Sequence, residues 1–124
     1  LGSLNSIRTF QDVRDAVRAY YLLSLEAEKG SFYPGETFNI AGDEAFKLTE
    51  VVEMMLKFST RKDIKITLSN DRLRPIDADY QMFDNSKIKS VIKWKPEIKV
   101  ENMFRDLLDY WRHQILEGRV PLNR

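Results

Sequence analysis

Cysteine is absent from this 124-residue sequence, which also has a single histidine and only five glycines. Without cysteine there is no disulfide and no thiolate metal ligand, and one histidine excludes a histidine-rich metal site. A reducing, cytoplasmic compartment is therefore expected. No apolar run approaches the roughly 20 residues of a membrane span, and no signal peptide is recognisable, so we expect no membrane partner.

An excess of one charge sign is also missing, because the formal net charge is only +1. Such a chain has no strong overall field to attract nucleic acid or an anionic membrane, and we expect no nucleic-acid partner. Hydrophobic residues make up 43% and charged residues 31%, which is typical of a globular protein. The length fits one domain over residues 1–124.

Several catalytic signatures are absent as well. The scattered glycines form neither a Gly-x-Gly-x-x-Gly nor a Gly-x-x-x-x-Gly-Lys phosphate loop. None of the five tyrosines has a lysine four residues later, so the Tyr-x-x-x-Lys proton relay of short-chain dehydrogenases is missing. His113 has no recognisable catalytic partners and is interpreted as an exposed or half-buried helix residue. We therefore expect the isolated chain to be no catalyst, with no metal and no cofactor of its own.

Helical spacing predicts two helices in the first half of the chain. The first has Asp12 as its N-cap and ends at Gly30. Its apolar face consists of Val13, Val17, Tyr20 and Tyr21, with Ser24 and Leu25. The Tyr20–Tyr21 pair is interpreted as a packing pair. The second helix covers residues 50–58 and is predicted to have Thr49 as its N-cap.

Two short strands are predicted between and after these helices. The first is "TFNIAG", residues 37–42, and the second is "IKITL", residues 64–68, where apolar and polar residues alternate. A short helix should then begin at Asp84 or Asn85. The resulting order of elements predicts a mixed α/β fold with few strands. So little sheet among so much helix indicates that the chain is part of something larger.

The last helix gives the strongest periodic signal. Its apolar residues are Val100, Met103, Phe104, Leu107, Leu108, Trp111 and Ile115. Gly118 and Pro121 end it, and the periodicity predicts that Met103, Phe104 and Trp111 belong to the core. In the connection before this helix, Trp94 and Pro96 are also expected to pack into the core rather than to stack on a ligand.

The segment "DRLRPIDADYQMF" carries the candidate ligand-binding residues. A planar guanidinium at Arg74 can bind two phosphate oxygens at once, and the following proline restricts Arg74 to an extended backbone. The alternative is a surface arginine paired with Asp77 or Asp79. The Asp77 carboxylate can accept hydrogen bonds from both hydroxyls of a vicinal diol, or it is a turn residue. Asp79 and Asp84 are interpreted as solvated or capping carboxylates, because no further metal ligands lie at suitable spacing.

Three stretches, "GSLNSIRTFQDVRDAVRAYYLLSLE", "ETFNIAG…KLTEVVEMML" and "LRPIDADYQMFDNSKIKSVIKWKPEIKVENMFRDLLDYW", occur in this order and span nearly the whole chain. Their succession resembles the C-terminal part of the extended short-chain dehydrogenases that act on sugar nucleotides. Within that group the nearest resemblance is to the GDP-mannose 4,6-dehydratases, whose chains have Gly-Asn-(Leu/Met)-Asp-Ser-x-Arg-Asp-Trp and later Phe-Arg-Pro-x-Glu-Val. This sequence departs at Asn5, at Thr9–Phe10 and at Asp77.

The resemblance implies a substrate-binding portion whose NADP-binding Rossmann domain, with the Thr/Ser, Glu, Tyr and Lys catalytic residues, lies elsewhere. In the family, NADP takes a hydride from C4 of the hexose, water is eliminated across C5 and C6, and the hydride returns to C6. The resemblance implies that Arg74 binds the nucleotide diphosphate and that Asp77 binds the ribose. It also implies that Arg8 reaches the diphosphate or the nucleotide from the other side of the cleft, the alternative being an ordinary loop charge. It also implies that Asn5 and Ser6 lie in a substrate-contacting loop.

The resemblance makes a GDP-sugar such as GDP-mannose the expected ligand, the chain's own Rossmann domain the expected partner, and a homo-oligomer the expected state of the longer protein. Two alternatives stay open. One is the C-terminal part of a UDP- or CDP-sugar epimerase or dehydratase. The other is a stand-alone protein-interaction domain whose aromatic first helix binds a partner.

Overall fold

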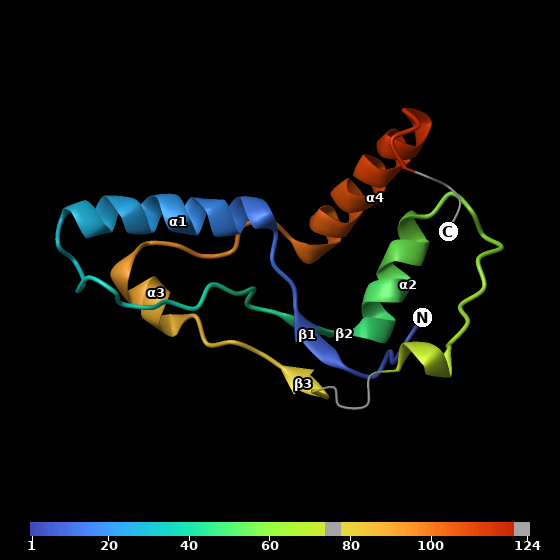
Figure 1. Cartoon of the computed structure of the whole chain (residues 1–124), viewed down its shortest axis with the longest axis horizontal. Helices are drawn as coiled ribbons and strands as arrows, with labels where there is room; N and C mark the ends of the chain where they lie inside the picture. The colour runs from blue at the N-terminus through green and yellow to red at the C-terminus, as the bar shows by residue number, and fades with distance from the viewer. Residues whose placement is uncertain (74–77, 121–124) are drawn as a thin grey trace.

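The computed structural model describes residues 1–73 and 78–120, and no helix within these ranges is long and apolar enough to span a membrane. The molecule is elongated, with three short strands in its middle and helices toward both ends (Figure 1). The strands are β1 (Ile7–Thr9), β2 (Ala45–Lys47) and β3 (Tyr80–Gln81). The helices are α1 (Val13–Glu28), α2 (Leu48–Phe58), α3 (Ser86–Val91) and α4 (Val100–Leu116), with a 3-10 turn η1 (Asn70–Arg72). The predicted mixed α/β fold is confirmed.

The sheet has the order β2-β1-β3, so the first strand of the chain lies at its centre. β1 runs antiparallel to β2 and parallel to β3. In this register Arg8 lies opposite Phe46 on one side and Gln81 on the other. The sheet thus brings together segments that lie near residues 8, 46 and 81 of the chain.

α1 begins as predicted. The Asp12 carboxylate accepts a hydrogen bond of 2.8 Å from the backbone N–H of Arg14, and Gly30 follows the helix with a φ of 70°. A positive φ costs glycine little, which explains why the helix ends there. Its predicted apolar face, however, is solvent-exposed in the described chain, since Val13 is 71% and Tyr20 64% exposed. The core is instead contacted by the side of α1 that carries Ala19, Leu22 and Leu23.

The start of α2 corrects the predicted cap. Lys47 is the N-cap residue, and its backbone N–H donates a hydrogen bond of 2.7 Å to the Glu50 carboxylate. Thr49 lies inside the first turn, where its hydroxyl donates to the carbonyl oxygen of Leu4 at 2.9 Å. The threonine therefore ties the N-terminal segment to α2 rather than capping the helix.

Both predicted strands are also wrong in place. Residues 37–42 form no strand, and the pairing segment comes slightly later as β2. Phe38 and Ile40 still pack against the core. The alternation of apolar residues therefore reflects their burial and not hydrogen-bonded pairing with another strand. Residues 64–68 are exposed and pair with no strand of the described residues. The sequence analysis did not predict β1, whose three residues carry no alternating apolar pattern.

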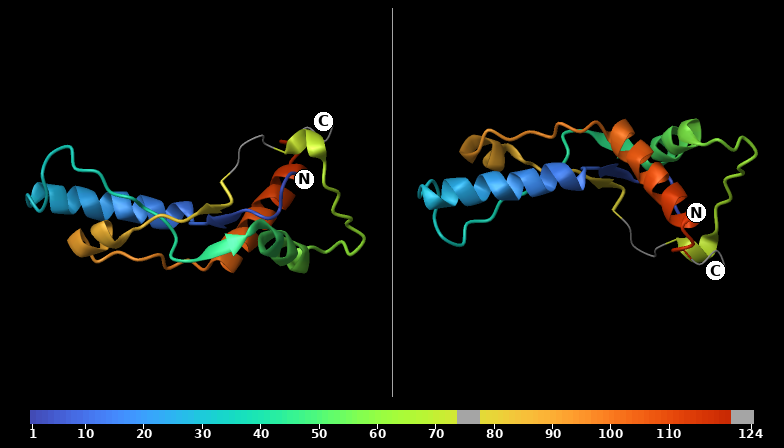
Figure 2. Two further views of the ribbon diagram at one scale, coloured as in Figure 1. Left: turned by 90° about the horizontal axis from the view of Figure 1, so that it is seen from below. Right: turned by 90° about the horizontal axis from the view of Figure 1, so that it is seen from above.

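The described core consists of two separate hydrophobic clusters, one between α1 and α3 and the other between α2 and α4. Figure 2 shows these two pairs of helices in different parts of the molecule. The first joins α1 to α3 and is built on Ala19, Ile88, Ile92 and Trp94. The second joins α2 to α4 and is built on Val51, Val100 and Phe104. Each large apolar side chain buried in this way contributes about 1.5–3 kcal/mol.

The outcome for the predicted aromatic core residues is mixed. Trp94 is buried, and Phe104 is buried within the second cluster, as predicted. Trp111 is 47% exposed, so its assignment to the core is wrong for the described chain. Leu107 and Ile115 on the same helix are exposed as well, although Arg112 of α4 donates a hydrogen bond of 2.8 Å to the carbonyl oxygen of Phe58 at the end of α2. His113 is exposed, as predicted.

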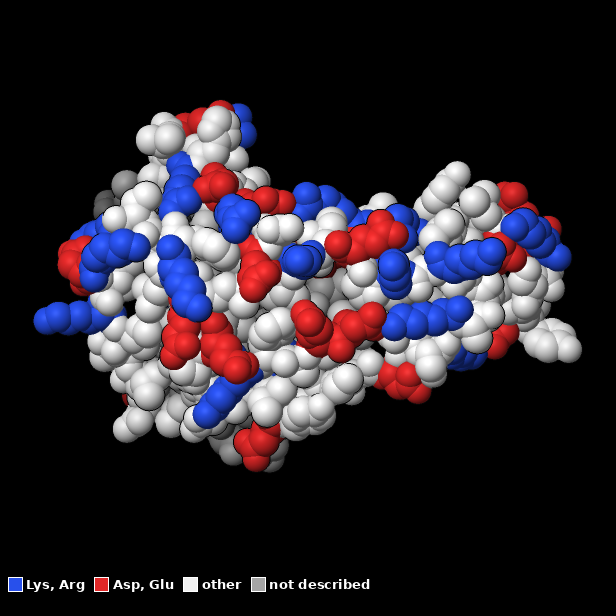
Figure 3. All heavy atoms as spheres, turned by 180° about the vertical axis from the view of Figure 1, so that it is seen from behind, with Lys and Arg blue, Asp and Glu red and all other residues white. Residues whose placement is uncertain are grey.

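Charged side chains of both signs are interspersed over the face drawn in Figure 3. Across the described residues, many charged side chains form ion pairs, such as Arg14 with Asp106 at 2.6 Å and Lys89 with Asp43 at 2.6 Å. Pairs this exposed contribute little to stability, about 0–1 kcal/mol each. No one sign dominates this face, so it offers no extended surface for a polyanion.

Candidate functional site

One hollow combines cationic residues from distant parts of the chain. It has a volume of about 370 Å³ and lies where the N-terminal segment meets the sheet and η1. Its lining consists of Gly2, Ser3, Arg8, Leu48, Arg72, Leu73 and Gln81. We call it the arginine hollow. Among the described residues that line it, two are arginines and none is acidic.

Arg8 is positioned by the centre of the sheet. It is the middle residue of β1 and is held between β2 and β3. Successive residues of a strand point to opposite faces, so Arg8 projects on the side opposite to Ile7 and Thr9. Its guanidinium also donates a hydrogen bond of 2.9 Å to the carbonyl oxygen of Ile7. A cation on a central strand is fixed more firmly than one on a loop, which suits it to orient a ligand.

Arg72 reaches the arginine hollow from the 3-10 turn. Its backbone N–H donates to the carbonyl oxygen of Ser69 at 3.1 Å, which closes η1. Gly2 lies against this turn so tightly that a Cβ atom on residue 2 would be 2.5 Å from the Arg72 carbonyl oxygen. Only glycine permits this approach, and it holds the backbone of Arg72 next to the N-terminal segment.

The chemistry of the arginine hollow fits an anion with several oxygens. Guanidinium groups carry N–H donors in planar forks that match phosphate oxygens in pairs. The Gln81 amide and the Ser3 hydroxyl add neutral donors and acceptors. A diphosphate or another doubly charged oxyanion would be complementary to this lining.

The predicted site residues fall into three groups. Arg8 lines the arginine hollow. Asn5 is exposed and Ser6 is buried, and neither is among the lining residues. Arg74 and Asp77 lie outside the described residues, although Leu73, the residue directly before Arg74 in the sequence, lines the hollow.

Sequence reasoning missed Arg72 and Gln81. Arg72 was visible as the first arginine of Arg-Leu-Arg-Pro, but nothing in the sequence distinguished it from a solvated charge. Gln81 gave no signal at all, because its place in the hollow depends on the parallel pairing of β3 with Arg8 on β1. Side chains brought together by sheet register are not evident from local sequence.

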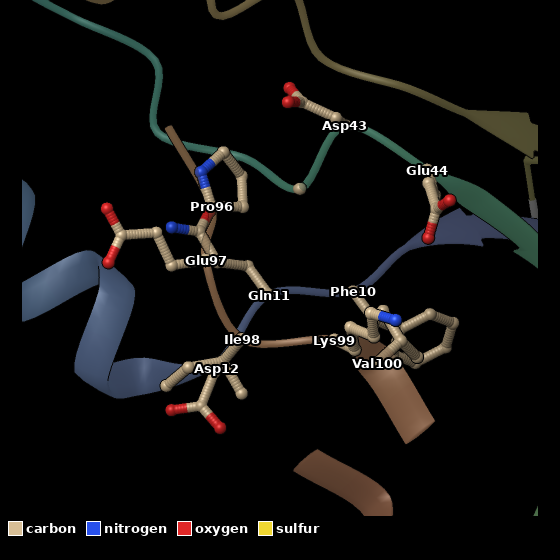
Figure 4. A pocket seen from close by; sticks show the side chains of 11 residues that line it. Phe10, Gln11, Asp12, Asp43, Glu44, Pro96, Glu97, Ile98, Lys99 and Val100 are labelled. Atoms are coloured by element: carbon tan, nitrogen blue, oxygen red, sulfur yellow. The ribbon is translucent and has the colours of Figure 1, made fainter. Parts of the chain in front are cut away.

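A second hollow of about 240 Å³ lies where three segments converge (Figure 4). Phe10 and Gln11 come from the connection between β1 and α1, and Asp43 and Glu44 from the chain before β2. Residues 96–100 come from the connection that leads into α4 and from the first residue of that helix. The approach is close, since a Cβ atom on residue 42 would be 2.1 Å from the Phe10 carbonyl oxygen.

The carboxylates of this second hollow do not form a cation site. In Figure 4 those of Asp12, Asp43 and Glu97 point in different directions, and each already has a cationic partner, namely Arg14, Lys89 and Arg18 respectively. A hydrogen bond from the Asn85 amide, and then the Lys89 ammonium, lower the pKa of Asp43. Within the described residues no group of three acidic or histidine side chains could hold a metal ion.

The two other acidic residues weighed as metal ligands have structural roles. The Asp84 carboxylate accepts a hydrogen bond of 2.8 Å from the Ser86 N–H at the start of α3, and this hydrogen bond lowers the pKa of Asp84. The Asp79 carbonyl oxygen accepts a hydrogen bond of 2.7 Å from the Ile7 N–H, beside the β1–β3 pairing. The capping interpretation of Asp84 is confirmed.

The glycines do not fit a dinucleotide. A phosphate cradle needs backbone N–H groups that point at the ligand. Here Gly2 and Gly42 lie against carbonyl oxygens, whereas Gly30, Gly35 and Gly118 have positive φ angles and open surroundings. The described residues of this chain therefore offer a nicotinamide dinucleotide no phosphate-binding loop.

Known proteins are similar to this chain over most of its length. The family model described as GDP-mannose 4,6 dehydratase matches residues 1–107. GDP-6-deoxy-D-mannose reductase of Pseudomonas aeruginosa is 24% identical over 117 residues, which cover 94% of this chain and 36% of that protein. The chain thus spans about a third of the length of this relative.

Solved structures show the same fold and the same partial coverage. The structure of RMD from Pseudomonas aeruginosa complexed with NADPH has a TM-score of 0.74 at 22% identity, covering 97% of this chain and 36% of that one. UDP-glucose 4-epimerase of Thermotoga maritima with UDP-glucose has a TM-score of 0.74 at 22% identity, covering 93% and 34%. The chain belongs to the GDP-mannose 4,6-dehydratase family and corresponds to a C-terminal part of such a protein.

Proposed function

We propose that this chain is the substrate-binding domain of a sugar-nucleotide dehydratase that converts GDP-mannose to GDP-4-keto-6-deoxymannose. The arginine hollow binds the diphosphate of the nucleotide. Arg74 and Asp77 add a further guanidinium fork and a ribose partner, as the family resemblance implies. NADP and the catalytic residues belong to a dinucleotide-binding domain in the rest of the longer protein, so residues 1–124 alone catalyse no dehydration.

The observation that supports this proposal best is that Arg8 and Arg72 line the same hollow. These residues are 64 positions apart and come from different elements, a central strand and a 3-10 turn. Two guanidinium groups beside one hollow repel each other, and a bound dianion relieves that repulsion.

The chain also docks onto the catalytic domain. The exposed face of α1, with Val13, Val17, Tyr20 and Tyr21, is apolar over several turns. An exposed apolar patch of this kind marks a surface that is covered in the working protein. Its partner here is the dinucleotide-binding domain of the same polypeptide, and the longer protein assembles as a homo-oligomer.

The test uses the longer protein and GDP-mannose. Arg8→Ala and Arg72→Ala should each weaken binding by roughly ten- to a hundredfold, because a charge-assisted hydrogen bond is worth about 1.5–3 kcal/mol. Arg61→Ala is the matched control, since Arg61 is exposed, pairs with Asp63 and lies outside the hollow. Titration calorimetry in which all three variants bind like the unmodified protein would refute the proposed site.

The same titration separates the alternatives. A UDP-glucose or CDP-glucose affinity above that for GDP-mannose would assign the chain to another sugar-nucleotide epimerase or dehydratase. The stand-alone interaction module is favoured by one observation, the aromatic face of α1. That reading requires that no sugar nucleotide binds to the longer protein and that no dinucleotide fingerprint precedes Leu1 in the coding sequence.

A further inference from the structure

The segment from Asp63 to Leu68 exposes an unused pairing edge. All six residues are solvent-exposed, and the segment stands apart from the sheet at one end of the molecule (Figure 1). Among the described residues, the backbone N–H and C=O groups of Ile64, Lys65 and Ile66 take part in no backbone hydrogen bond. Apolar residues alternate here, with Ile64 46%, Ile66 43% and Leu68 61% exposed.

One end of this edge is already paired. The backbone nitrogen of Leu1 donates a hydrogen bond of 2.8 Å to the carbonyl oxygen of Thr67. The carbonyl oxygen of Leu1 accepts a hydrogen bond of 2.8 Å from the backbone N–H of Ser69. In a parallel ladder, one residue makes both of its backbone hydrogen bonds to the residues just before and just after the one that lies opposite it. Leu1 therefore lies opposite Leu68 as one rung of a parallel pair.

The rung is held rigidly. Gly2 packs against the Arg72 carbonyl oxygen at a distance that no larger residue allows, so the chain direction at Leu1 is fixed by the turn that follows the edge. Residues before Leu1 therefore leave in the direction of Thr67, Ile66 and Lys65. A parallel ladder repeats every two residues, so each further pair before Leu1 adds two hydrogen bonds to the edge.

We infer that residues 63–68 are the acceptor edge for a parallel β-strand formed by the polypeptide immediately before Leu1 in the longer protein. The inference rests on the chain's being a C-terminal part of that protein and not on the arginine hollow, so nucleotide binding can fail without affecting it. The strand begun in this way ends beside Arg72 and leads through Gly2 into β1. It ties the arginine hollow to the preceding part of the polypeptide.

The register makes the inference specific. The second residue before Leu1 lies opposite Ile66 and the fourth lies opposite Ile64. The N–H groups of Lys65 and Thr67 face the incoming strand, whereas those of Ile64 and Ile66 face away from it. Side chains of paired residues share one face of a sheet, so the second and fourth residues before Leu1 are apolar to match Ile66 and Ile64.

Hydrogen exchange on the longer protein tests the ladder residue by residue. The Lys65 and Thr67 amides should exchange at least tenfold more slowly than those of Ile64 and Ile66, which serve as controls within the same segment. Uniformly fast exchange, or protection of Ile64 and Ile66 alone, would overturn the inference. If all four amides are protected, the outcome is decided by the variants below.

Two proline variants of the longer protein form a matched pair. Proline at the second residue before Leu1 removes the N–H that donates to the Lys65 carbonyl, so it should speed exchange of Lys65 and Thr67 at least tenfold. Proline at the first residue before Leu1 removes an N–H that faces away, and it should leave both amides protected. An unchanged circular dichroism spectrum shows that each variant is folded. Equal effects of the two prolines would contradict the register.

Discussion

The indole Nε1–H of Trp94 donates a hydrogen bond of 3.0 Å to the carbonyl oxygen of Asp15. At the same place the Asp15 carboxylate accepts hydrogen bonds from the backbone N–H groups of Glu97 and Ile98, at 3.1 and 3.0 Å. The first turn of α1 thereby holds the connection between α3 and α4. Because α4 belongs to the second hydrophobic cluster, Asp15 joins the two clusters.

Asp15→Asn should lower the free energy of unfolding by about 2–3 kcal/mol. Asp15 is only 2% exposed, and besides the two backbone donors its carboxylate accepts from the Arg18 guanidinium at 2.8 Å. An amide puts a donor where these groups need an acceptor. Asp63→Asn is the control, since the Arg61–Asp63 pair is solvent-exposed and its loss should change stability by less than about 0.5 kcal/mol. Urea unfolding of the 124-residue chain measures both, and equal losses would show that Asp15 has no special role.

Stability should fall in acid, and Asp15 should carry part of that fall. Burial raises the pKa of Asp15, but hydrogen bonds from Arg18 and from the Ile98 and Glu97 amides outweigh it, so the pKa lies below its ordinary value. A carboxyl with a lowered pKa in the folded state stabilises fully above the unfolded pKa of about 4, and the contribution is lost as the pH falls through the folded value. Melting temperatures from pH 6 to pH 2 should drop below about pH 4, and less steeply in Asp15→Asn. An equally steep drop in melting temperature in the original chain and in Asp15→Asn would refute the assignment to Asp15.

Gly42→Ala should destabilise the chain by about 1–3 kcal/mol through overpacking. The new Cβ atom would be 2.1 Å from the carbonyl oxygen of Phe10, and backbone cannot yield as a flexible side chain does. Gly30→Ala is the matched control, because its positive φ of 70° is strained for alanine but its surroundings are open. The control should cost about 1 kcal/mol. Thermal unfolding in which Gly42→Ala costs no more than Gly30→Ala would contradict the close approach.

The sequence predicted the helices well because their signals are local. The Asp12 cap, the start of α3 after Asn85 and the end of α4 at Gly118 depend on residues within one turn of each helix end. It failed for the strands because pairing is not local. Residues 64–68 have the right alternation, but within the described chain they pair with Leu1 and with no strand, whereas β1 has a strand on each side but no alternation.

The candidate site was predicted in part for the same reason. Arg8 was identified through a family motif, whereas Arg72 and Gln81 reach the arginine hollow through η1 and the β1–β3 register. The apolar faces show the opposite limit. Periodicity finds the apolar residues of α1 and α4 correctly, but it cannot tell a face that is buried in this chain from one that another part of the protein covers.

Arg74→Ala in the longer enzyme should lower kcat/KM by roughly ten- to a hundredfold, chiefly through a higher KM for the sugar nucleotide. Arg74→Lys should recover only part of this, because an ammonium keeps the charge without the bidentate fork. Asp77→Asn should have a milder effect, since the amide still accepts one hydrogen bond from ribose. Steady-state kinetics with thermal melts are the measurement. A surface ion pair would instead give an unchanged KM, a small stability loss and full rescue by lysine.

Val17→Gln with Tyr21→Gln should reduce self-association of the 124-residue chain. Val17 is 57% and Tyr21 62% exposed on the apolar face of α1, and an uncovered face of this kind favours association between copies. Removing exposed apolar groups should change the unfolding free energy of this chain by less than about 0.5 kcal/mol. In the longer protein the same double variant should cost more, because the proposed docking onto the catalytic domain covers this face there. Sedimentation velocity and urea unfolding report the two effects.

The matched control for this face is Leu116→Gln at the end of α4. Leu116 is 85% exposed and lies at the far end of the molecule from the C-terminal end of α1 (Figure 1). The Leu116→Gln variant should have the same sedimentation coefficient as the original chain if α1 is the associating surface. A double variant that stays as associated as the original chain would remove α1 as the docking face. If the double variant changes the unfolding free energy equally in the short chain and in the longer protein, nothing further covers α1 in the longer protein.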